Sequence, residues 1–222
     1  MGIKAAIYTH LSDRLFETVF SDRCHQFVMR HEWDLCVTPE GHEIDEYDCG
    51  GAEYLVVHED GRHLTSCRLR PAASRTMLLD HFAEAFPRAE AFLRRQSGPL
   101  YELTRFLRAP ALSVREGAGA LLAFAEALDD FRNEREAVGF VAVVYPGVSR
   151  FLRQSGVRFL VLDVSTIGGR RVELICITQA VAPARLLARQ HVYAYALEEA
   201  CARPMPRPAA QHPAPADLLV AA

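Results

Sequence analysis

The sequence predicts an α/β fold, a three-layer α/β/α sandwich around one mixed sheet. The chain has 222 residues, of which 50% are apolar and 24% charged, and this suits a globular domain with a full core. Amphipathic helical stripes alternate along the chain with short runs rich in β-branched and aromatic residues. Where two strand-like runs are adjacent, glycine-containing turns join them. Together these three observations favour helices packed on both faces of a sheet.

The N-terminal part of the chain is predicted to form a helical region followed by a hairpin. Apolar side chains between Leu15 and Phe27 recur at the spacing of one or two amphipathic helices. After an acidic loop, the runs EYLVVHE and RHLTSCRLRP flank Asp60-Gly61. Because an Asp-Gly pair between alternating runs is a strong hairpin signal, these runs are predicted to be two paired strands.

The remaining elements alternate between helices and strands. Residues 76–96 contain short helical pieces, and YELTRFLR is a strand that ends before Pro110. The run GALLAFAEALDDFRNER carries an apolar helical stripe, and GFVAVVYP follows it as a buried strand. Pro146 suits the first turn of a helix that ends at Gly156. Two last strands are predicted to pair across Gly168-Gly169.

The composition predicts one domain, residues 1–202, and a Pro/Ala-rich disordered tail, residues 203–222. The six cysteines form no C-x-x-C pair and are expected to be free thiols. No run approaches the ~20 apolar residues that span a bilayer, and the first residues lack the pattern of a secretory signal. Basic tracts typical of nucleic-acid binding are missing. We therefore expect a cytoplasmic protein that binds neither nucleic acid nor membrane.

Familiar catalytic and metal-binding motifs are missing from the sequence. It contains no H-E-x-x-H, no Ca-loop pattern, no G-x-S-x-G and no phosphate-binding glycine loop, so no metal site is expected. A different feature is EIDEYD, residues 43–48, which has four carboxylates in six positions. Charged and aromatic residues lie on both sides of it in the chain: Arg23, Phe27, Trp33, Arg68, Glu102 and Arg105.

Opposite charges beside aromatic rings suit a zwitterionic ligand. Carboxylates can hold an amine or a sulfonium, arginines can hold a carboxylate, and the rings of Phe27 and Trp33 offer a face for a sulfonium or an adenine. A network of ion pairs that only stabilises the protein fits the same spacing equally well.

The order of these residues resembles that in the LuxI-type acyl-homoserine lactone synthases, the autoinducer synthases of bacterial quorum sensing. The resemblance lies in R-x3-F-x5-W, then D-x-x-D, then C-R-L-R-P with M-L shortly after, then Y-E-L-T-R-F. It covers about residues 10–185. The matching positions are Arg23, Phe27, Trp33, Asp45, Asp48, Arg68, Glu102 and Arg105.

The resemblance implies a fold similar to the GCN5-related N-acetyltransferases. It also implies an enzyme that transfers an acyl group from acyl carrier protein, or from acyl-CoA, to the amine of S-adenosylmethionine. Lactone closure then releases methylthioadenosine. S-adenosylmethionine would be a substrate, so no cofactor is expected, and the protein is expected to be a monomer.

The resemblance also implies roles for single residues. Glu102 would deprotonate the amine or only orient it, while Arg68 and Arg105 would hold charge during closure; Arg105 could equally brace Asp45 or Asp48. The residues expected to bind S-adenosylmethionine and complete the charge cluster are Arg23, Phe27, Trp33, Asp45 and Asp48. The other two carboxylates of EIDEYD, Glu43 and Glu46, are expected to face solvent.

An apolar acyl pocket is expected from Phe82, Leu103, Val141, Val143, Phe151 and Leu152, although plain core packing fits each of them as well. Val141 stands where related enzymes for 3-oxo chains often have Thr, so it favours an unsubstituted chain. Arg150, Arg153 and Arg158 form a basic edge that suits an acidic carrier protein or simply a solvated face. Another GCN5-like acetyltransferase fits less well, since no Q/R-x-x-G-x-G/A loop is present. A non-catalytic sensor also fits less well, since Glu102 and Arg68 are both in place.

Overall fold

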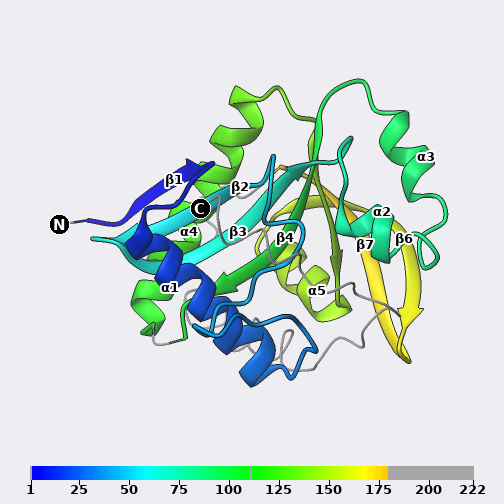
Figure 1. The fold of residues 1–222 in the computed structure, drawn as a ribbon. Helices are drawn as coiled ribbons and strands as arrows, with labels where there is room; N and C mark the ends of the chain where they lie inside the picture. Colours follow the sequence, from blue (N-terminus) through cyan, green and yellow to red (C-terminus); the bar gives the residue numbers. More distant parts are fainter. Residues whose placement is uncertain (1, 111, 180–222) are drawn as a thin grey trace.

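A seven-stranded mixed sheet forms the centre of the computed structural model, which describes residues 2–110 and 112–179 (Figure 1). The strands are β1 (Lys4–Tyr8), β2 (Glu53–Glu59), β3 (Arg62–Pro71), β4 (Leu100–Arg108), β5 (Gly139–Val144), β6 (Arg158–Ile167) and β7 (Arg170–Gln179). Their order in the sheet is β1-β2-β3-β4-β5-β7-β6. Neighbouring strands are antiparallel except β4 and β5, which are parallel.

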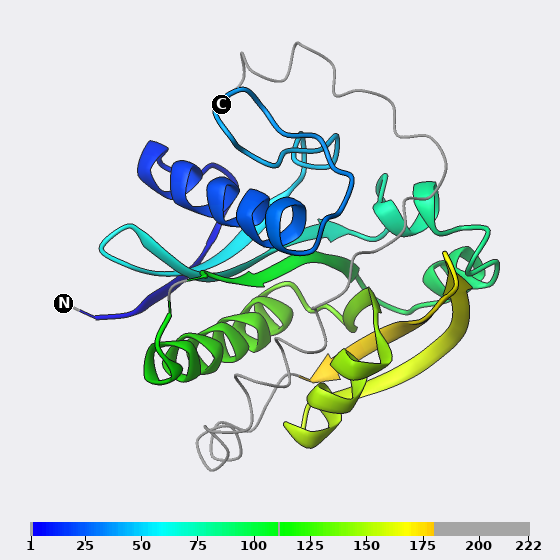
Figure 2. The ribbon, with the colours of Figure 1, turned by 90° about the horizontal axis from the view of Figure 1, so that it is seen from below.

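Helices cover both faces of this sheet, as Figure 2 shows with α1 on one side and α4 and α5 on the other. The helical elements are α1 (Asp13–Arg23), the π-helical segment η1 (Cys24–Arg30), α2 (Met77–His81), α3 (Ala89–Arg94), α4 (Val114–Glu134) and α5 (Pro146–Gln154). α2 and α3 lie on the side of α1. The predicted three-layer α/β/α sandwich around a mixed sheet is therefore confirmed.

Local sequence signals explain where these elements begin and turn. Asp60 and Gly61 both have left-handed backbones, with φ of 51° and 78°, as a two-residue hairpin requires, and the predicted β2–β3 hairpin is confirmed. α4 begins with a capping box in which Ser113 and Glu116 bond each other's backbone N–H. Pro146 occupies the first turn of α5, where its missing N–H costs nothing.

Apolar side chains gather in three clusters. One lies between the sheet and the α4 and α5 layer, and it includes Leu55, Phe124 and Phe140. The opposite face carries two clusters, one under α1 and one under α2 and α3. Between these two, over the central strands β3 and β4, the face carries charged residues instead. The site therefore lies where the apolar packing of this face is interrupted.

The pairing of β4 with β5 is short. Only Leu100, Tyr101 and Glu102 have partners on β5, the last being Val141, although β4 continues to Arg108 and β5 to Val144. Beyond this point the two strands part, and Figure 1 shows them running in different directions. The sheet therefore consists of two antiparallel parts joined by one short parallel pair.

Two features differ from the prediction or lie outside the described residues. β1 was not predicted; it is a short edge strand of five residues that pairs with β2, and KAAIY is too short to show a clear period. The predicted tail, residues 203–222, and the end of the predicted domain lie outside the described residues, so both stay predictions. The five described cysteines are free, as predicted, and Cys201 lies outside the described residues.

Candidate active site

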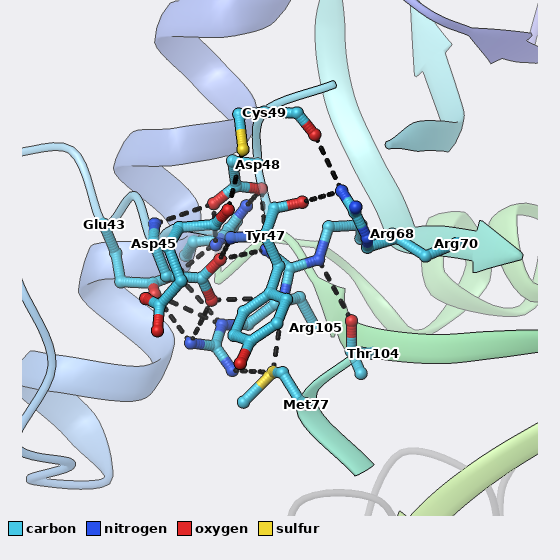
Figure 3. Close-up of polar contacts among 12 residues, drawn as sticks. Glu43, Asp45, Tyr47, Asp48, Cys49, Arg68, Arg70, Met77, Thr104 and Arg105 are labelled. Carbon is cyan, nitrogen blue, oxygen red and sulfur yellow. Dashed lines mark hydrogen bonds and ion pairs between the residues drawn. The ribbon is translucent and has the colours of Figure 1, made fainter. Parts of the chain in front are cut away.

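Six charged residues from four separate parts of the chain meet on the α1 face of the sheet, and Figure 3 labels all of them except Arg23. We call this set the charge network: Arg23, Glu43, Asp45, Asp48, Arg68 and Arg105. Arg23 ends α1, Arg68 lies on β3 and Arg105 on β4, while the carboxylates come from the loop before β2. Arg23 and Arg68 are each only 1% exposed, and Glu43 is fully buried.

Arg23 is held by two carboxylates. Its Nε donates to Oε2 of Glu43 at 2.6 Å, and its two Nη atoms donate to the two carboxylate oxygens of Asp48 at 2.8 and 2.9 Å. The second pair is bidentate, the geometry in which arginine and carboxylate bind most strongly. Burial alone lowers the pKa of Arg23, but Asp48 and Glu43 raise it more, so the net shift is upward.

Arg68 bonds to both aspartates and to β4. Its two Nη atoms donate to the two oxygens of Asp45, and Nη1 also lies 2.9 Å from Oδ1 of Asp48. Its Nε donates to Oγ1 of Thr104 at 3.1 Å. Burial raises the pKa of Asp48, but Arg23 and Arg68 lower it further, and the net pKa lies well below its ordinary value. Asp48 is therefore ionised at neutral pH.

Arg105 reaches the charge network because the backbone of β4 is distorted at this residue. Two residues of β4, Arg105 and Phe106, stand opposite one residue of β3, which is a β-bulge, and Arg105 has a left-handed φ of 52°. Strand alternation alone would place Arg105 on the α4 face with Leu103. The bulge instead brings its guanidinium to Glu43 and Asp45, with Nη2 at 2.9 and 2.8 Å from them.

The carboxylates are positioned by a tight turn in their own loop. The backbone N–H of Asp45 donates to Asp48 Oδ2 and that of Tyr47 donates to Asp45 Oδ1, both at 2.9 Å. Such local bonds are typical of aspartate in turns. Asp45 and Asp48 therefore lie where they were predicted to lie, within the charged cluster.

The expectation that Glu43 faces solvent is wrong. Glu43 is 0% exposed and bonds to both Arg23 and Arg105, so it is the carboxylate that joins α1 to β4. Glu43 and Asp45 are two residues apart in an extended segment, and alternate residues of such a segment share one side. That spacing was the available signal. Glu46 is partly buried, 3.4 Å from His81.

Two further residues support the charge network and were missed. Arg70, two positions after Arg68 on β3, donates to the carbonyls of Tyr47, Cys49 and Gly50 at 2.7–3.2 Å and so anchors the acidic loop. Met77 brings its sulfur to within 3.3 Å of Arg68 Nη2 and 3.6 Å of Arg105 Nη1. The spacing of Arg68 and Arg70 along a strand places them on one face and indicates a shared role.

Glu102 lies beside the charge network at the last residue of β4 that pairs with β5. Its two carboxylate oxygens accept the N–H groups of Met77 and Leu78 at 3.1 and 2.6 Å, at the start of α2. It is 3% exposed. Burial raises the pKa of Glu102, and the N–H of Leu78 and the charge of Arg68 only partly oppose this, so the net shift is upward. A carboxylate with a raised pKa is a stronger base.

Three rings lie next to the charge network, and we call Phe27, His31 and Trp33 the aromatic cluster. Arg105 lies over the ring of Phe27, with its central carbon 5.7 Å from the ring centre. Phe27 stacks on Trp33 with centroids 4.9 Å apart, and His31 lies 6.4 Å from Trp33. The structure therefore places Phe27 against Arg105 and Trp33 against Phe27, while the predicted role of the two rings in ligand binding stays a prediction.

The six residues proposed for the acyl pocket are divided between the two faces of the sheet. Phe82, Val141 and Val143 pack in the cluster under α2 and α3. Leu103, Phe151 and Leu152 pack with the cluster under α4 and α5. They therefore do not form one wall. Leu103 and Val143 do lie on β4 and β5 just beyond the last paired residues.

A cavity of about 780 Å³ opens on the far side of Asp48, between α1 and the loop before β2. Phe16, Phe20, Ile44 and Tyr54 line its apolar part. Among the predicted site residues only Asp48 contributes to its wall. Neither Glu102 nor Arg105 lines this cavity.

The described residues also bear on metals and membranes. Among residues 2–110 and 112–179, no group of three or more His, Cys, Asp or Glu side chains is arranged to hold a metal ion. Within the same part of the chain, no helix has the length and apolar character needed to cross a membrane.

The comparisons with known proteins agree on one family. A family model described as autoinducer synthase matches residues 8–180. An acyl-homoserine-lactone synthase of Vibrio anguillarum is 28% identical over 184 residues, which is 80% of this chain and 91% of that protein.

Solved structures show the same fold. The AHL synthase LasI has a TM-score of 0.68 at 24% identity, covering 84% of this chain and 94% of that one. The CoA-dependent acyl-homoserine lactone synthase BjaI, solved with SAM and isopentyl-CoA, has a TM-score of 0.65 at 19% identity, with 93% and 95% covered. An acyl-CoA N-acyltransferase from Pseudomonas aeruginosa has a TM-score of 0.52 at 16% identity, with 79% and 99% covered. The fold is therefore that of the N-acyltransferases, as predicted.

Proposed function

The chain belongs to the autoinducer synthase family, and from this premise we propose that it is an acyl-homoserine lactone synthase. It transfers an acyl group from a thioester to the amine of S-adenosylmethionine, and lactone closure then releases methylthioadenosine. The observation that carries the residue assignments is the position of Glu102, which lies between the buried charge network and the place where β4 and β5 part.

The charge network is proposed to act mainly as a rigid frame. Three arginines face three carboxylates, and each guanidinium nitrogen already has a partner. A balanced set of this kind is preorganised, so the site does not need to rearrange its own charges when substrate binds. The residues of the charge network are therefore proposed to position the substrate while they remain paired with one another.

Two guanidinium groups keep capacity for the substrate carboxylate. Arg68 Nη2 and Arg105 Nη1 both point to the sulfur of Met77, at 3.3 and 3.6 Å. A thioether is a weak acceptor, so a carboxylate bound there would gain much stronger charge-assisted bonds. We assign the carboxylate of S-adenosylmethionine to this position, which agrees with the predicted roles of Arg68 and Arg105.

Glu102 is the proposed general base. An ammonium cannot attack a thioester until it loses a proton, and a carboxylate whose pKa is raised by burial is suited to accept it, directly or through one water. The two N–H groups of α2 use only part of the acceptor capacity of Glu102, so lone pairs remain for the amine. The two N–H groups also fix the orientation of the Glu102 carboxylate.

The thioester carbonyl is proposed to lie where β4 and β5 part. Pairing stops after Glu102 and Val141, so backbone N–H groups just beyond these residues are suited to stabilise the oxyanion of the tetrahedral intermediate. Once the amide has formed, the substrate's own carboxylate attacks its γ-carbon. The new C–O bond forms as the C–S bond breaks, and the sulfonium leaves as neutral methylthioadenosine. Holding the carboxylate near the γ-carbon lowers the entropic part of this barrier.

The acyl donor is proposed to dock beside α5 and β6. Arg150, Arg153 and Arg158 are exposed there, and the apolar side chains of Leu160 and Val161 are 59% and 42% exposed. This mixture suits the acidic surface of an acyl carrier protein. BjaI is described as CoA-dependent, so acyl-CoA is the second candidate donor. The cytoplasmic location and the monomeric state stay predictions.

Expression in a host without a lactone synthase tests the reaction. Mass spectrometry of extracts should show the homoserine lactone fragment, and the parent mass should identify the acyl chain. Glu102→Gln should lower the rate about 10²–10⁴-fold, the range for loss of a general base. Glu84→Gln, an exposed glutamate between α2 and α3, is the matched control and should retain full activity.

Purified protein with acyl carrier proteins and acyl-CoAs completes the test, because the host can lack the correct donor. Folded protein that binds S-adenosylmethionine but makes no lactone from any donor would contradict the assignment. Full activity of Glu102→Gln would contradict only the role of Glu102.

A further inference from the structure

Two buried ring nitrogens of the aromatic cluster have no hydrogen-bond partner among the described residues. They are Nδ1 of His31 and Nε1 of Trp33. Buried polar atoms in folded proteins nearly always have partners, and one left alone costs free energy. His31 is only 1% exposed, so bulk water does not reach its ring. Both atoms therefore need a partner that is absent from the described chain.

The hydrogen bonds of His31 show that both nitrogens are donors. Gln26 Nε2 lies 2.7 Å from His31 Nε2, so the amide donates to this ring nitrogen. Burial, together with the charge of Arg30, lowers the pKa of His31, so the ring is neutral at pH 7 and carries one proton. Because Nε2 accepts, that proton is on Nδ1. The indole nitrogen of Trp33 is also a donor.

The backbone fixes these donors near the charge network. Glu32 has a left-handed φ of 53° and turns the chain back on itself. The N–H of Trp33 then donates to the carbonyl of Phe27 at 2.8 Å, and the two rings stack. Phe27 in turn lies under Arg105. The ring of Phe27 thus contacts Arg105 on one side of the cluster and Trp33 on the other. The unpartnered donors therefore lie next to the residues proposed to hold the methionyl part of the substrate.

We infer that His31 is a specificity-determining residue that, with Trp33, binds the purine ring of S-adenosylmethionine through acceptor nitrogens on the edge of the base. This inference rests on the proposed function. Adenine presents three ring nitrogens that accept and one amino group that donates, so a pair of N–H donors matches its edge. A flat base also packs well against the indole of Trp33, whereas a ribose hydroxyl would not need two aromatic donors.

Intrinsic fluorescence gives a direct measurement, because Trp33 is the single tryptophan of the chain. Titration of purified protein with S-adenosylmethionine and with methylthioadenosine yields both dissociation constants, and calorimetry checks them. His31→Leu keeps an apolar side chain of similar size and removes the donor. We expect it to weaken both ligands by about five- to tenfold, the effect of one lost hydrogen bond. Methylthioadenosine lacks the amino acid, so an equal effect on both ligands assigns the contact to the nucleoside.

Two variants separate recognition from structure. His31→Asn places an amide N–H near the position of Nδ1 and should restore most of the affinity. His25→Leu replaces an exposed histidine of the same π-helical segment and should leave both dissociation constants unchanged. Equal melting temperatures of wild type and His31→Leu would show that the loss is not due to unfolding.

Deaza analogues of methylthioadenosine identify the contact. One of the 1-, 3- and 7-deaza compounds should bind wild type about tenfold more weakly, and His31→Leu should bind that analogue and methylthioadenosine equally. Wild-type affinity in His31→Leu, or the same sensitivity to every analogue in wild type and variant, overturns the role of His31 while lactone synthesis remains. Absence of binding and of lactone in wild type overturns the proposed function itself, and the role of His31 with it.

Discussion

The charge network and the aromatic cluster are neighbours, yet their polar atoms differ in how they are satisfied. In the charge network, every guanidinium nitrogen of Arg23, Arg68 and Arg105 has a partner. In the aromatic cluster, two buried ring nitrogens have none among the described residues. The first region has its polar partners within the chain and is therefore expected to stabilise the folded state, whereas the second is the region to which we assign ligand recognition. Stability and recognition are thus assigned to adjacent groups of residues.

The largest effect is expected when one charge of the network is removed. Asp48→Asn leaves Arg23 and Arg68 buried with too little negative charge, and it should lower the free energy of unfolding by about 3–5 kcal/mol. Urea or guanidinium unfolding followed by circular dichroism measures this. Glu90→Gln in α3 breaks the exposed pair with Arg94 and should cost only about 0.5 kcal/mol or less. Equal losses in the two variants would show that the charge network is not the stabilising region.

The next largest effect is a dependence of stability on pH. Because the folded pKa of Asp48 is lowered, its contribution is present above its unfolded pKa of about 3.9 and is lost as the pH falls below that value. The loss should be on the order of 2 kcal/mol, as for a salt-bridged aspartate. Denaturant unfolding at a series of pH values measures it.

Glu102 should show the opposite sign in the same experiment. Its folded pKa is raised, so the folded state holds the proton more tightly, and stability should fall as the pH rises from about 4.3, its unfolded pKa, through the raised value. Comparing wild type with Asp48→Asn and with Glu102→Gln separates the two slopes. If neither slope changes in its variant, the two carboxylates are not the groups that titrate.

A smaller effect is expected at Val141, which is fully buried beneath α2 and α3. Val141→Thr introduces a hydroxyl at a position that we expect to contact the acyl chain, and it should shift the ratio of kcat/KM for 3-oxoacyl over unsubstituted acyl donors by about tenfold or less. Competition between the two donors, read by mass spectrometry, measures the ratio. An unchanged ratio would remove Val141 from the acyl pocket and leave it as a core residue.

The smallest effect is expected in the aromatic cluster without ligand. His31→Leu removes a buried donor that has no partner and also the acceptor of the Gln26 amide, so the free energy of unfolding should fall by only about 1 kcal/mol. Denaturant unfolding without and with methylthioadenosine measures both states. A large loss without ligand would show that His31 is part of the structural frame and would erase the contrast with the charge network.

The sequence predicted which residues belong to the charge network better than it predicted how their side chains are directed. Asp45 and Asp48 could be placed by spacing and by family resemblance, and the sheet brings them to Arg68 as expected. The direction of the Arg105 side chain could not be predicted, because it depends on a β-bulge and a left-handed backbone. An arginine rarely adopts that backbone, so the residue type gives no signal for it. Glu43 was misplaced for a related reason: four acids within six residues suggest a solvated turn unless their partners are already known.

The helices and hairpins were more readily predicted than the aromatic cluster. Capping residues, Pro146 and the Asp-Gly turn act locally, so a short window of sequence contains their whole signal. His31 carries no such signal. Its unpartnered nitrogen becomes visible only when the tertiary contacts of Gln26, Trp33 and the ring itself are known.

Where β4 and β5 part, no pairing joins these two strands, and Leu103 and Val143 lie there with their side chains packed on opposite faces of the sheet. An acyl chain that enters beside Glu102 would therefore cross the sheet instead of lying along it. The charged substrate would stay on the α1 side and the hydrocarbon would extend toward α4 and α5. In this arrangement the sheet would separate the charged part of the substrate from its hydrocarbon chain, and the side chains at the crossing, rather than those at the far end, would limit which acyl groups fit.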